Sequence, residues 1–205
     1  MAGWLRRTYD APGLTQYPTG RHLAAVQARL GGAVVVCLDV SGSMYGYPLS
    51  QAVLGCERFV DEALEGHYAV AMLFWHHAVA GSTGLTRDRG ELVRFLRTAT
   101  AGGGNNIVPT LDRSRALLQD LAGDRVIAIF GDGDLGDPGA ATARAAQLQA
   151  ENIRIITCGL GQASAESLDV ISTESGGAGP RVAAVDDIAD SIAGMSSGLR
   201  RRGRS

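Results

Sequence analysis

The sequence has few cysteines, no long apolar run and no excess of one charge. The three cysteines show no CxxC spacing and lie inside apolar segments, which predicts buried, reduced thiols rather than disulfides or a zinc site. No window reaches the roughly 18 apolar residues of a membrane span, and the first 20 residues contain no apolar signal-peptide core. The net charge of −2 argues against a fold-wide nucleic-acid-binding face. We therefore expect a cytoplasmic protein with neither a membrane nor a nucleic acid as its partner.

Glycine, by contrast, is abundant: its 28 residues are roughly 14% of the chain, against an average of about 7%. The glycines concentrate where apolar runs end, which predicts many tight turns between strands and helices. A chain of 205 residues with 45% hydrophobic content is long enough for one substantial core. We expect one domain over residues 31–198, preceded by an arm with a short helix (1–30) and followed by a basic tail (199–205).

Short apolar runs alternate with segments of helical periodicity from residue 33 onward, which is typical of a parallel sheet covered by helices. The first run, AVVVCL, is continuous and rich in β-branched residues, as expected for a central strand buried on both faces. The pattern predicts a three-layer, doubly wound, Rossmann-like α/β fold. The runs read as parallel strands are Ala33–Leu38, Tyr68–Trp75, Arg125–Phe130 and Ile153–Cys158, with a short strand near Arg181–Val185.

One further segment, Ala78–Leu85, follows the second run through only two residues. Because this connection is too short for a crossover helix, we expect a short antiparallel strand at the edge of the sheet. Apolar residues at helical spacing predict the helices, and Pro109 and Pro138 fit first helical turns. The expected helices are His22–Leu30, Leu49–Leu64, a helix around Leu92–Leu96, Leu111–Leu121, Ala140–Ala150, Ser164–Ser175 and Asp186–Leu199.

The strongest local signal is a turn with three oxygen-bearing side chains, Asp39, Ser41 and Ser43, directly after the first strand. Open α/β sheets bind their ligands at the carboxyl ends of central strands, where the next helix points its positive N-terminus. Carboxylate and hydroxyl oxygens are the hard ligands that Mg²⁺ prefers. Further oxygen ligands are expected from Asp132, which follows the strand Arg125–Phe130, and from the glycine-rich loop that contains Asn105.

At this point the chain resembles the von Willebrand factor A family. The metal-ion-dependent adhesion site of that family reads DxSxS, then a threonine in a GGT-like loop, then an aspartate in a TDG-like turn. The corresponding stretches here are DVSGS from Asp39, GGGNNI around Asn105 and GDG around Asp132, in the same order and within residues 33–195. The resemblance implies a metal site in which the aspartates act largely through waters and one coordination position is left for a partner's carboxylate.

The resemblance also implies a role and a partner. The chain is expected to be an interaction module without catalytic activity, working with Mg²⁺, or with Mn²⁺ or Ca²⁺, on a protein partner. Many bacterial relatives of this compact type are encoded with AAA+ ATPases of the MoxR kind or with other stress and conflict components, so the resemblance implies a partner of that kind. The residues expected to contact the partner around the ion are Gly42, Met44, Tyr45, His76, Asn106 and Asp134.

Two positions depart from the family pattern. Asn105 stands in the threonine position, and Gly131 stands where a threonine usually precedes the second aspartate. An asparagine carbonyl can bind Mg²⁺ or Ca²⁺, whereas Thr110 lies too far along the chain to substitute. A purely structural role stays open as the alternative to metal binding for each of these residues: the serines as helix caps, and Asp132 and Asn105 as turn or loop residues.

Competing motifs are weaker. The stretch Gly131–Gly136 matches GxGxxG, but its two aspartates would repel a pyrophosphate, and Ala143 stands where an EF-hand needs glutamate. His76 and His77 are expected to point to opposite faces of a strand, and Trp75 to pack in the core.

Two other functions stay open. A Mg²⁺-dependent phosphohydrolase would use Asp39 as its nucleophile, but it would want a second carboxylate where Ser41 stands, and the sequence contains no lysine to steady a phosphoryl group. A structural subunit that has lost its metal is the other alternative, and Asn105 favours it.

Overall fold

The structure, a computed structural model, describes residues 32–160, 162–173, 182–183 and 188–199. Within these residues six strands form one sheet in the order β3-β2-β1-β4-β5-β6. Every neighbouring pair is parallel except β2 and β3, which are antiparallel. The doubly wound α/β fold and its antiparallel edge strand are therefore confirmed. The strands are β1 (Gly32–Asp39), β2 (Ala69–Trp75), β3 (Val79–Ser82), β4 (Asp124–Gly131), β5 (Arg154–Leu160) and β6 (Val182–Ala183).

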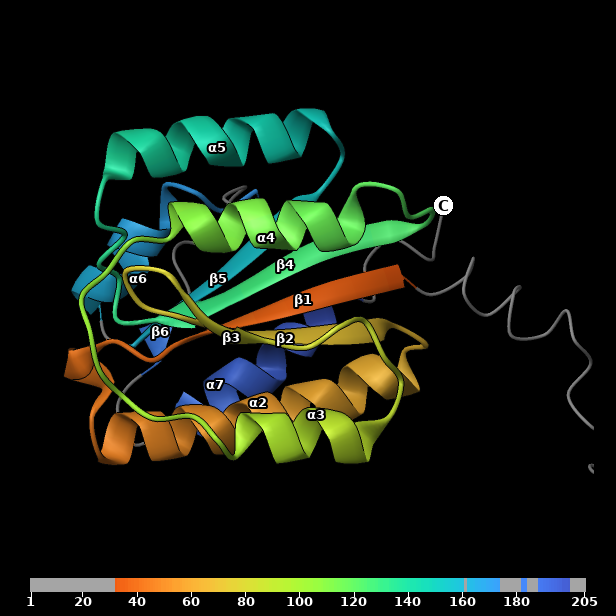
Figure 1. Cartoon of the computed structure of the whole chain (residues 1–205), viewed down its shortest axis with the longest axis horizontal. Helices are drawn as coiled ribbons and strands as arrows, with labels where there is room; N and C mark the ends of the chain where they lie inside the picture. The colour runs from red at the N-terminus through yellow and green to blue at the C-terminus, as the bar shows by residue number, and fades with distance from the viewer. Residues whose placement is uncertain (1–31, 161, 174–181, 184–187, 200–205) are drawn as a thin grey trace, which may run out of the picture.

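Helices cover both faces of the sheet (Figure 1): α4 and α5 lie on one face, and α2, α3 and α7 on the other. The helix expected at residues 22–30 lies outside the described residues. Among the described helices, none combines the length and the hydropathy that crossing a membrane requires. The helices are α2 (Tyr47–Glu65), α3 (Arg89–Leu96), α4 (Val108–Leu118), α5 (Pro138–Ala150), α6 (Gln162–Asp169) and α7 (Ile188–Gly194), with short 3-10 turns η1 (Gly42–Met44) and η3 (Met195–Gly198).

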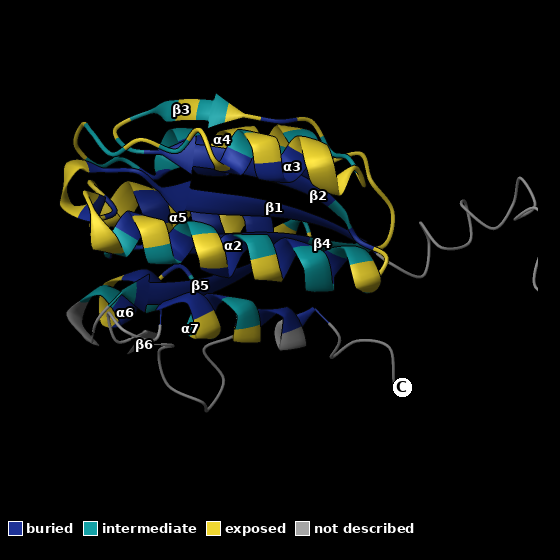
Figure 2. Ribbon diagram, turned by 90° about the horizontal axis from the view of Figure 1, so that it is seen from below, coloured by how far each residue is buried: buried dark blue, intermediate teal, exposed yellow. Residues whose placement is uncertain are grey.

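The central strand β1 is buried along its whole length, as Figure 2 shows. Its alternate side chains enter two separate cores: Val34, Val36 and Leu38 pack with α2 and α7, whereas Val35 and Cys37 pack with α4 and α5. Full burial of each such valine or leucine stabilises the fold by about 1.5–3 kcal/mol. All three cysteines are buried, as predicted, and none forms a disulfide within the described residues.

The connection from β1 to α2 is a tight turn at the carboxyl end of the sheet that buries Ser41 and exposes Ser43 and Tyr45. Gly46 precedes α2 with φ +85°, a conformation that favours glycine, and a proline occupies the first helical turn. The buried side of α2, which includes Cys56, Phe59 and Val60, then fixes the helix against the sheet. The turn between Asp39 and Gly46 is thus held at both ends by buried elements.

Candidate metal centre

Main-chain hydrogen bonds join the loops at the carboxyl end of the sheet. The Gly102 amide donates to Val40 O at 2.8 Å, and the Gly42 amide donates to Gly103 O at 3.2 Å. The glycine-rich loop is held on its other side as well, because the Asn106 amide donates to His76 O at 2.9 Å. These bonds fix the loop that carries Asn105 against the turn that follows β1.

Asp39 is fully buried at the end of β1. Its Oδ1 accepts from the Ser41 amide at 2.7 Å, and its Oδ2 accepts from the Asp132 amide at 3.3 Å. Burial raises the pKa of Asp39 to about 6, the hydrogen bonds with Ser41 oppose that shift, and the charge of Asp132 adds to it. Among the described residues no basic side chain forms an ion pair with Asp39.

The two serines connect Asp39 to the end of β4. The hydroxyl oxygens of Ser41 and Ser43 lie 3.0 Å apart, and Ser43 donates a hydrogen bond to Asp132 Oδ2, although the two residues are 89 positions apart in the sequence. The structure therefore brings together four of the five predicted metal ligands, Asp39, Ser41, Ser43 and Asp132. A purely capping role for Ser41 is not supported, since its side chain makes no cap hydrogen bond to η1.

The side-chain carbonyl of Asn105 is an acceptor that lacks a donor within the part of the chain that the structure describes. Its Nδ2 donates to Asp134 Oδ2 at 2.9 Å, which fixes the orientation of the amide. Its Oδ1 is buried and has no hydrogen-bond partner among the described residues. Because burying an unpaired carbonyl is unfavourable, this oxygen fits a place beside a cation. The same bond from Asn105, with the Gly136 amide, lowers the pKa of Asp134, which stays ionised.

The donor set is rich in neutral oxygens. The described residues contain no group of three or more His, Cys, Asp or Glu that would hold a metal. The set at this site has only two carboxylates, with the remaining oxygens coming from hydroxyl and amide groups. Such oxygens suit Mg²⁺ or Mn²⁺ with retained waters better than Zn²⁺, which prefers nitrogen and sulfur.

The glycine that replaces the family threonine at position 131 has a structural reason. A Cβ atom there would lie 2.8 Å from Asp39 Oδ2 and 3.1 Å from Trp75 Cζ2. Trp75 pairs with Asp39 in the register of β1 and β2, and it is fully buried, as predicted. The tryptophan and the aspartate thus fill the space that a larger side chain would need.

The residues predicted to contact a partner divide into accessible and buried ones. Tyr45 is 80% exposed, and Gly42 and Asp134 are also exposed around the turn. Met44 is only 1% exposed because its side chain packs in the core with α2, so it is not available to a partner.

His76 and Asn106 are partly exposed beside the glycine-rich loop. The expectation that His76 and His77 point to opposite faces is wrong. Both lie beyond the end of β2, and their rings stack with centroids 4.2 Å apart because they are in a turn rather than in a strand. The ring of His76 accepts from the Ala78 amide at Nδ1, 3.1 Å away.

The chain is similar to known proteins of one family. Residues 34–134 match the von Willebrand factor type A domain family. Over these residues, just under half of its length, the chain is similar to von Willebrand factor A domains. Domains of this family are general protein-interaction modules. A search of curated proteins finds no match.

Solved structures of the same type of domain cover most of the chain. The von Willebrand factor domain of the type V pilus tip protein Mfa5 from Porphyromonas gingivalis is 14% identical, with a TM-score of 0.73 over 86% of this chain and 98% of that one. BatB from Bacteroides thetaiotaomicron is 18% identical, with a TM-score of 0.65 over 82% and 98%. Manganese-loaded TRAP protein from Plasmodium vivax is 16% identical, with a TM-score of 0.61 over 80% and 72%. At these identities the likeness concerns the fold.

Proposed function

We propose that this domain holds a divalent cation through Asp39, Ser41, Ser43, Asn105 and Asp132, and uses it to bind an acidic side chain of a protein partner. One observation carries the proposal. A fully buried carboxylate, Asp39, has no cationic side chain to compensate it among the described residues, and it belongs to a hydrogen-bonded chain of oxygens that ends at the surface. Buried carboxylates are normally paired with a cation or bound to a metal.

The arrangement suits binding rather than catalysis. A cation held partly by neutral hydroxyl and amide oxygens keeps attraction for an incoming carboxylate. The carboxylate of Asp39 faces backbone amides of Ser41 and Asp132, which hold it in place instead of presenting it to a substrate. The accessible residues around it, chiefly Tyr45 and Gly42, then form the rim that a partner meets.

Mg²⁺ is the proposed ion, with Mn²⁺ and Ca²⁺ as alternatives. The manganese-loaded TRAP structure shares this fold, so Mn²⁺ is a reasonable probe. For the partner we propose a protein that presents an accessible Asp or Glu, with an AAA+ ATPase of the MoxR kind in the bacterial cytoplasm as the setting to test. The choice of this partner is supported by the resemblance of the turn Asp39–Ser43 to the metal-binding motif of the family.

Calorimetric titration with Mn²⁺ and Mg²⁺ tests the site. Wild type should bind one ion, and Asp39→Asn or the double variant Ser41→Ala/Ser43→Ala should weaken binding by about a hundredfold, because each change removes oxygens or charge from the shell. Asp61→Asn is the matched control: Asp61 forms an ion pair with Arg89 elsewhere on the surface, and its loss should leave the affinity unchanged. Equal heats for wild type and Asp39→Asn would contradict the proposal and favour a structural subunit without metal.

A further inference from the structure

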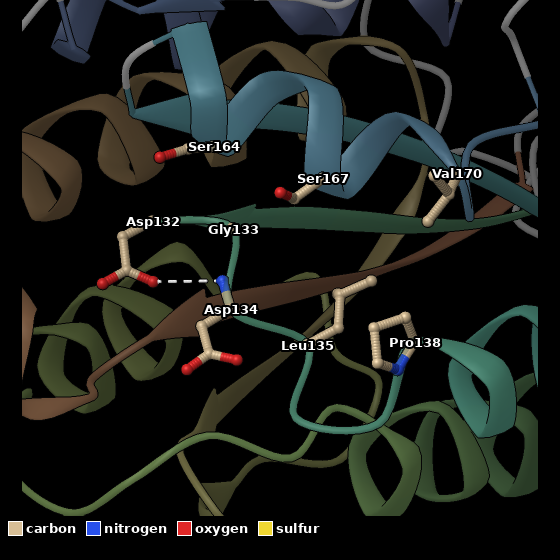
Figure 3. A pocket seen from close by; sticks show the side chains of 8 residues that line it. All are labelled: Asp132, Gly133, Asp134, Leu135, Pro138, Ser164, Ser167 and Val170. Carbon is tan, nitrogen blue, oxygen red and sulfur yellow. Dashed lines mark hydrogen bonds between the residues drawn. The ribbon is translucent and has the colours of Figure 1, made fainter.

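A pocket adjoins the metal centre on the side of α6. It has a volume of about 550 Å³ and lies between the loop that follows β4 and the helix α6. Figure 3 shows Ser164 and Ser167 of α6, with Val170 directly after that helix, on one side and Leu135 and Pro138 on the other. The pocket shares Asp132 with the metal centre, so one partner can occupy both at once. Its lining residues are Asp132, Gly133, Asp134, Leu135, Pro138, Ser164, Ser167 and Val170.

The two walls of this pocket are fixed to each other. Gly133 has φ +94°, and a Cβ there would lie 2.5 Å from the Cα of Ser164, so the loop lies directly against α6. The Ile107 amide donates to Leu135 O at 3.2 Å, which ties the same loop to the segment that carries Asn105. The pocket is therefore formed before any ligand arrives, which lowers the cost of ordering on binding.

The chemistry of the pocket is divided along its length. In Figure 3 the carboxylates of Asp132 and Asp134 lie at one end, and Leu135, Pro138 and Val170 lie at the other. No lining residue is basic. The hydroxyl of Ser164 already donates to Leu160 O at 3.1 Å, so its oxygen faces a ligand as an acceptor. The pocket thus offers acceptors and negative charge at one end and an apolar wall at the other.

We propose that this pocket takes a lysine or arginine side chain of the same partner that gives its carboxylate to the metal ion. This inference rests on the proposed function. The alkyl stem packs against Leu135, Pro138 and Val170, and the cationic head lies beside Asp134. A bound divalent ion balances two of the three aspartates Asp39, Asp132 and Asp134, and the charge of the third remains for the cationic head. The domain then recognises an acidic and a basic side chain of its partner together, rather than an acidic side chain alone.

Nuclear magnetic resonance titration of the full chain in saturating Mg²⁺ tests the pocket, with n-butylguanidinium as the probe and pentan-1-ol as its uncharged counterpart. Butylguanidinium should shift the amide resonances of Gly133 and Ser164 and bind about fivefold more tightly than pentanol, which is the effect of one exposed ion pair. No shift at these residues, or equal affinity for the two probes, would overturn the proposal.

Two matched variants separate the pocket from the metal centre. Val170 is 55% exposed, and Val170→Arg places a positive charge at the pocket, so butylguanidinium shifts should disappear while Mn²⁺ binding stays as in wild type. Leu54, 48% exposed on α2, gives the control Leu54→Arg, which should leave both unchanged. Retained butylguanidinium shifts in Val170→Arg would refute the pocket. Loss of Mn²⁺ binding in Asp39→Asn concerns only the metal centre, so the two proposals fail separately.

Discussion

Two aspartates lie at opposite ends of the neighbouring parallel strands β1 and β4: Asp39 is fully buried and Asp124 is partly buried. Asp124 begins β4, and its carboxylate accepts from Arg154 Nε at 3.0 Å and from the Tyr68 hydroxyl at 2.7 Å. Asp39 ends β1, and backbone amides are its hydrogen-bond donors, with no cation paired to it among the described residues. Both carboxylates are at least partly removed from water, but only the charge of Asp124 is balanced by a cationic side chain among the described residues.

At the amino ends of the strands the charge of Asp124 is balanced by Arg154, so the pair links β4 to β5. At the carboxyl ends no cationic side chain is paired with Asp39 among the described residues, and burial raises its pKa. Under the proposed function this charge is the part of the site that a metal ion compensates, and such a site is maintained at some expense of stability.

The largest expected effect comes from breaking the ion pair between Asp124 and Arg154. Arg154→Met leaves the partly buried Asp124 without its cation and should lower the free energy of unfolding by about 2–3 kcal/mol, somewhat less than for a fully buried pair. Urea denaturation measures the change. Arg58→Met is the control, because the Arg58–Asp190 pair has side chains 57% and 78% exposed and its loss should change stability by about 0.5 kcal/mol or less. Equal losses in the two variants would contradict the comparison.

The burial of Asp39 should make the free energy of unfolding depend on pH. The folded-state pKa of Asp39, about 6, lies above its ordinary value of 3.8, so between these pH values the folded protein keeps a proton that the unfolded chain has released. The contribution of Asp39 is therefore fully present below pH 3.8 and is lost as pH rises through 6. We expect metal-free wild type to lose on the order of 2 kcal/mol over this window relative to Asp39→Asn.

Denaturation in EDTA at several pH values measures that loss for both variants. Adding Mg²⁺ should remove the difference in slope, since a bound cation favours the charged form. Parallel curves for wild type and Asp39→Asn in EDTA would show that Asp39 does not carry an uncompensated charge.

The smallest expected effect concerns the space around Asp39. Gly131→Ala brings a methyl group against Asp39 and Trp75 and should lower the free energy of unfolding by about 1–2 kcal/mol, as overpacking does. Gly104→Ala serves as the control, because a Cβ at Gly104 meets nothing within 4 Å, and it should change stability by less than about 0.5 kcal/mol. Thermal or urea unfolding that ranks the two variants equally would contradict this packing.

Much of the fold follows from local patterns in the sequence. The run AVVVCL predicts a strand buried on both faces, and β1 is that strand. The short link after Trp75 predicts the antiparallel pairing of β3, which the register confirms. These patterns are local because the period of side-chain burial and the reach of a short turn depend only on neighbouring residues. The cluster of oxygen-bearing side chains in the turn after β1 is also evident from the sequence, because Asp39, Ser41 and Ser43 lie within five positions.

Other features depend on residues far apart in the chain. Only the packed structure shows that Met44 enters the core, that His76 and His77 stack, and that Trp75 and Asp39 leave no room for a side chain at Gly131.

The sequence by itself determined which segments form the main strands and which oxygen-bearing side chains follow β1 and β4. Tertiary structure decided that Ser43 reaches Asp132, that the side-chain carbonyl of Asn105 has no hydrogen-bond donor among the described residues, and that a pocket opens toward α6. The physical reason is that these contacts join separate loops, whose positions are set by how strands pair and helices pack rather than by the residues next to them.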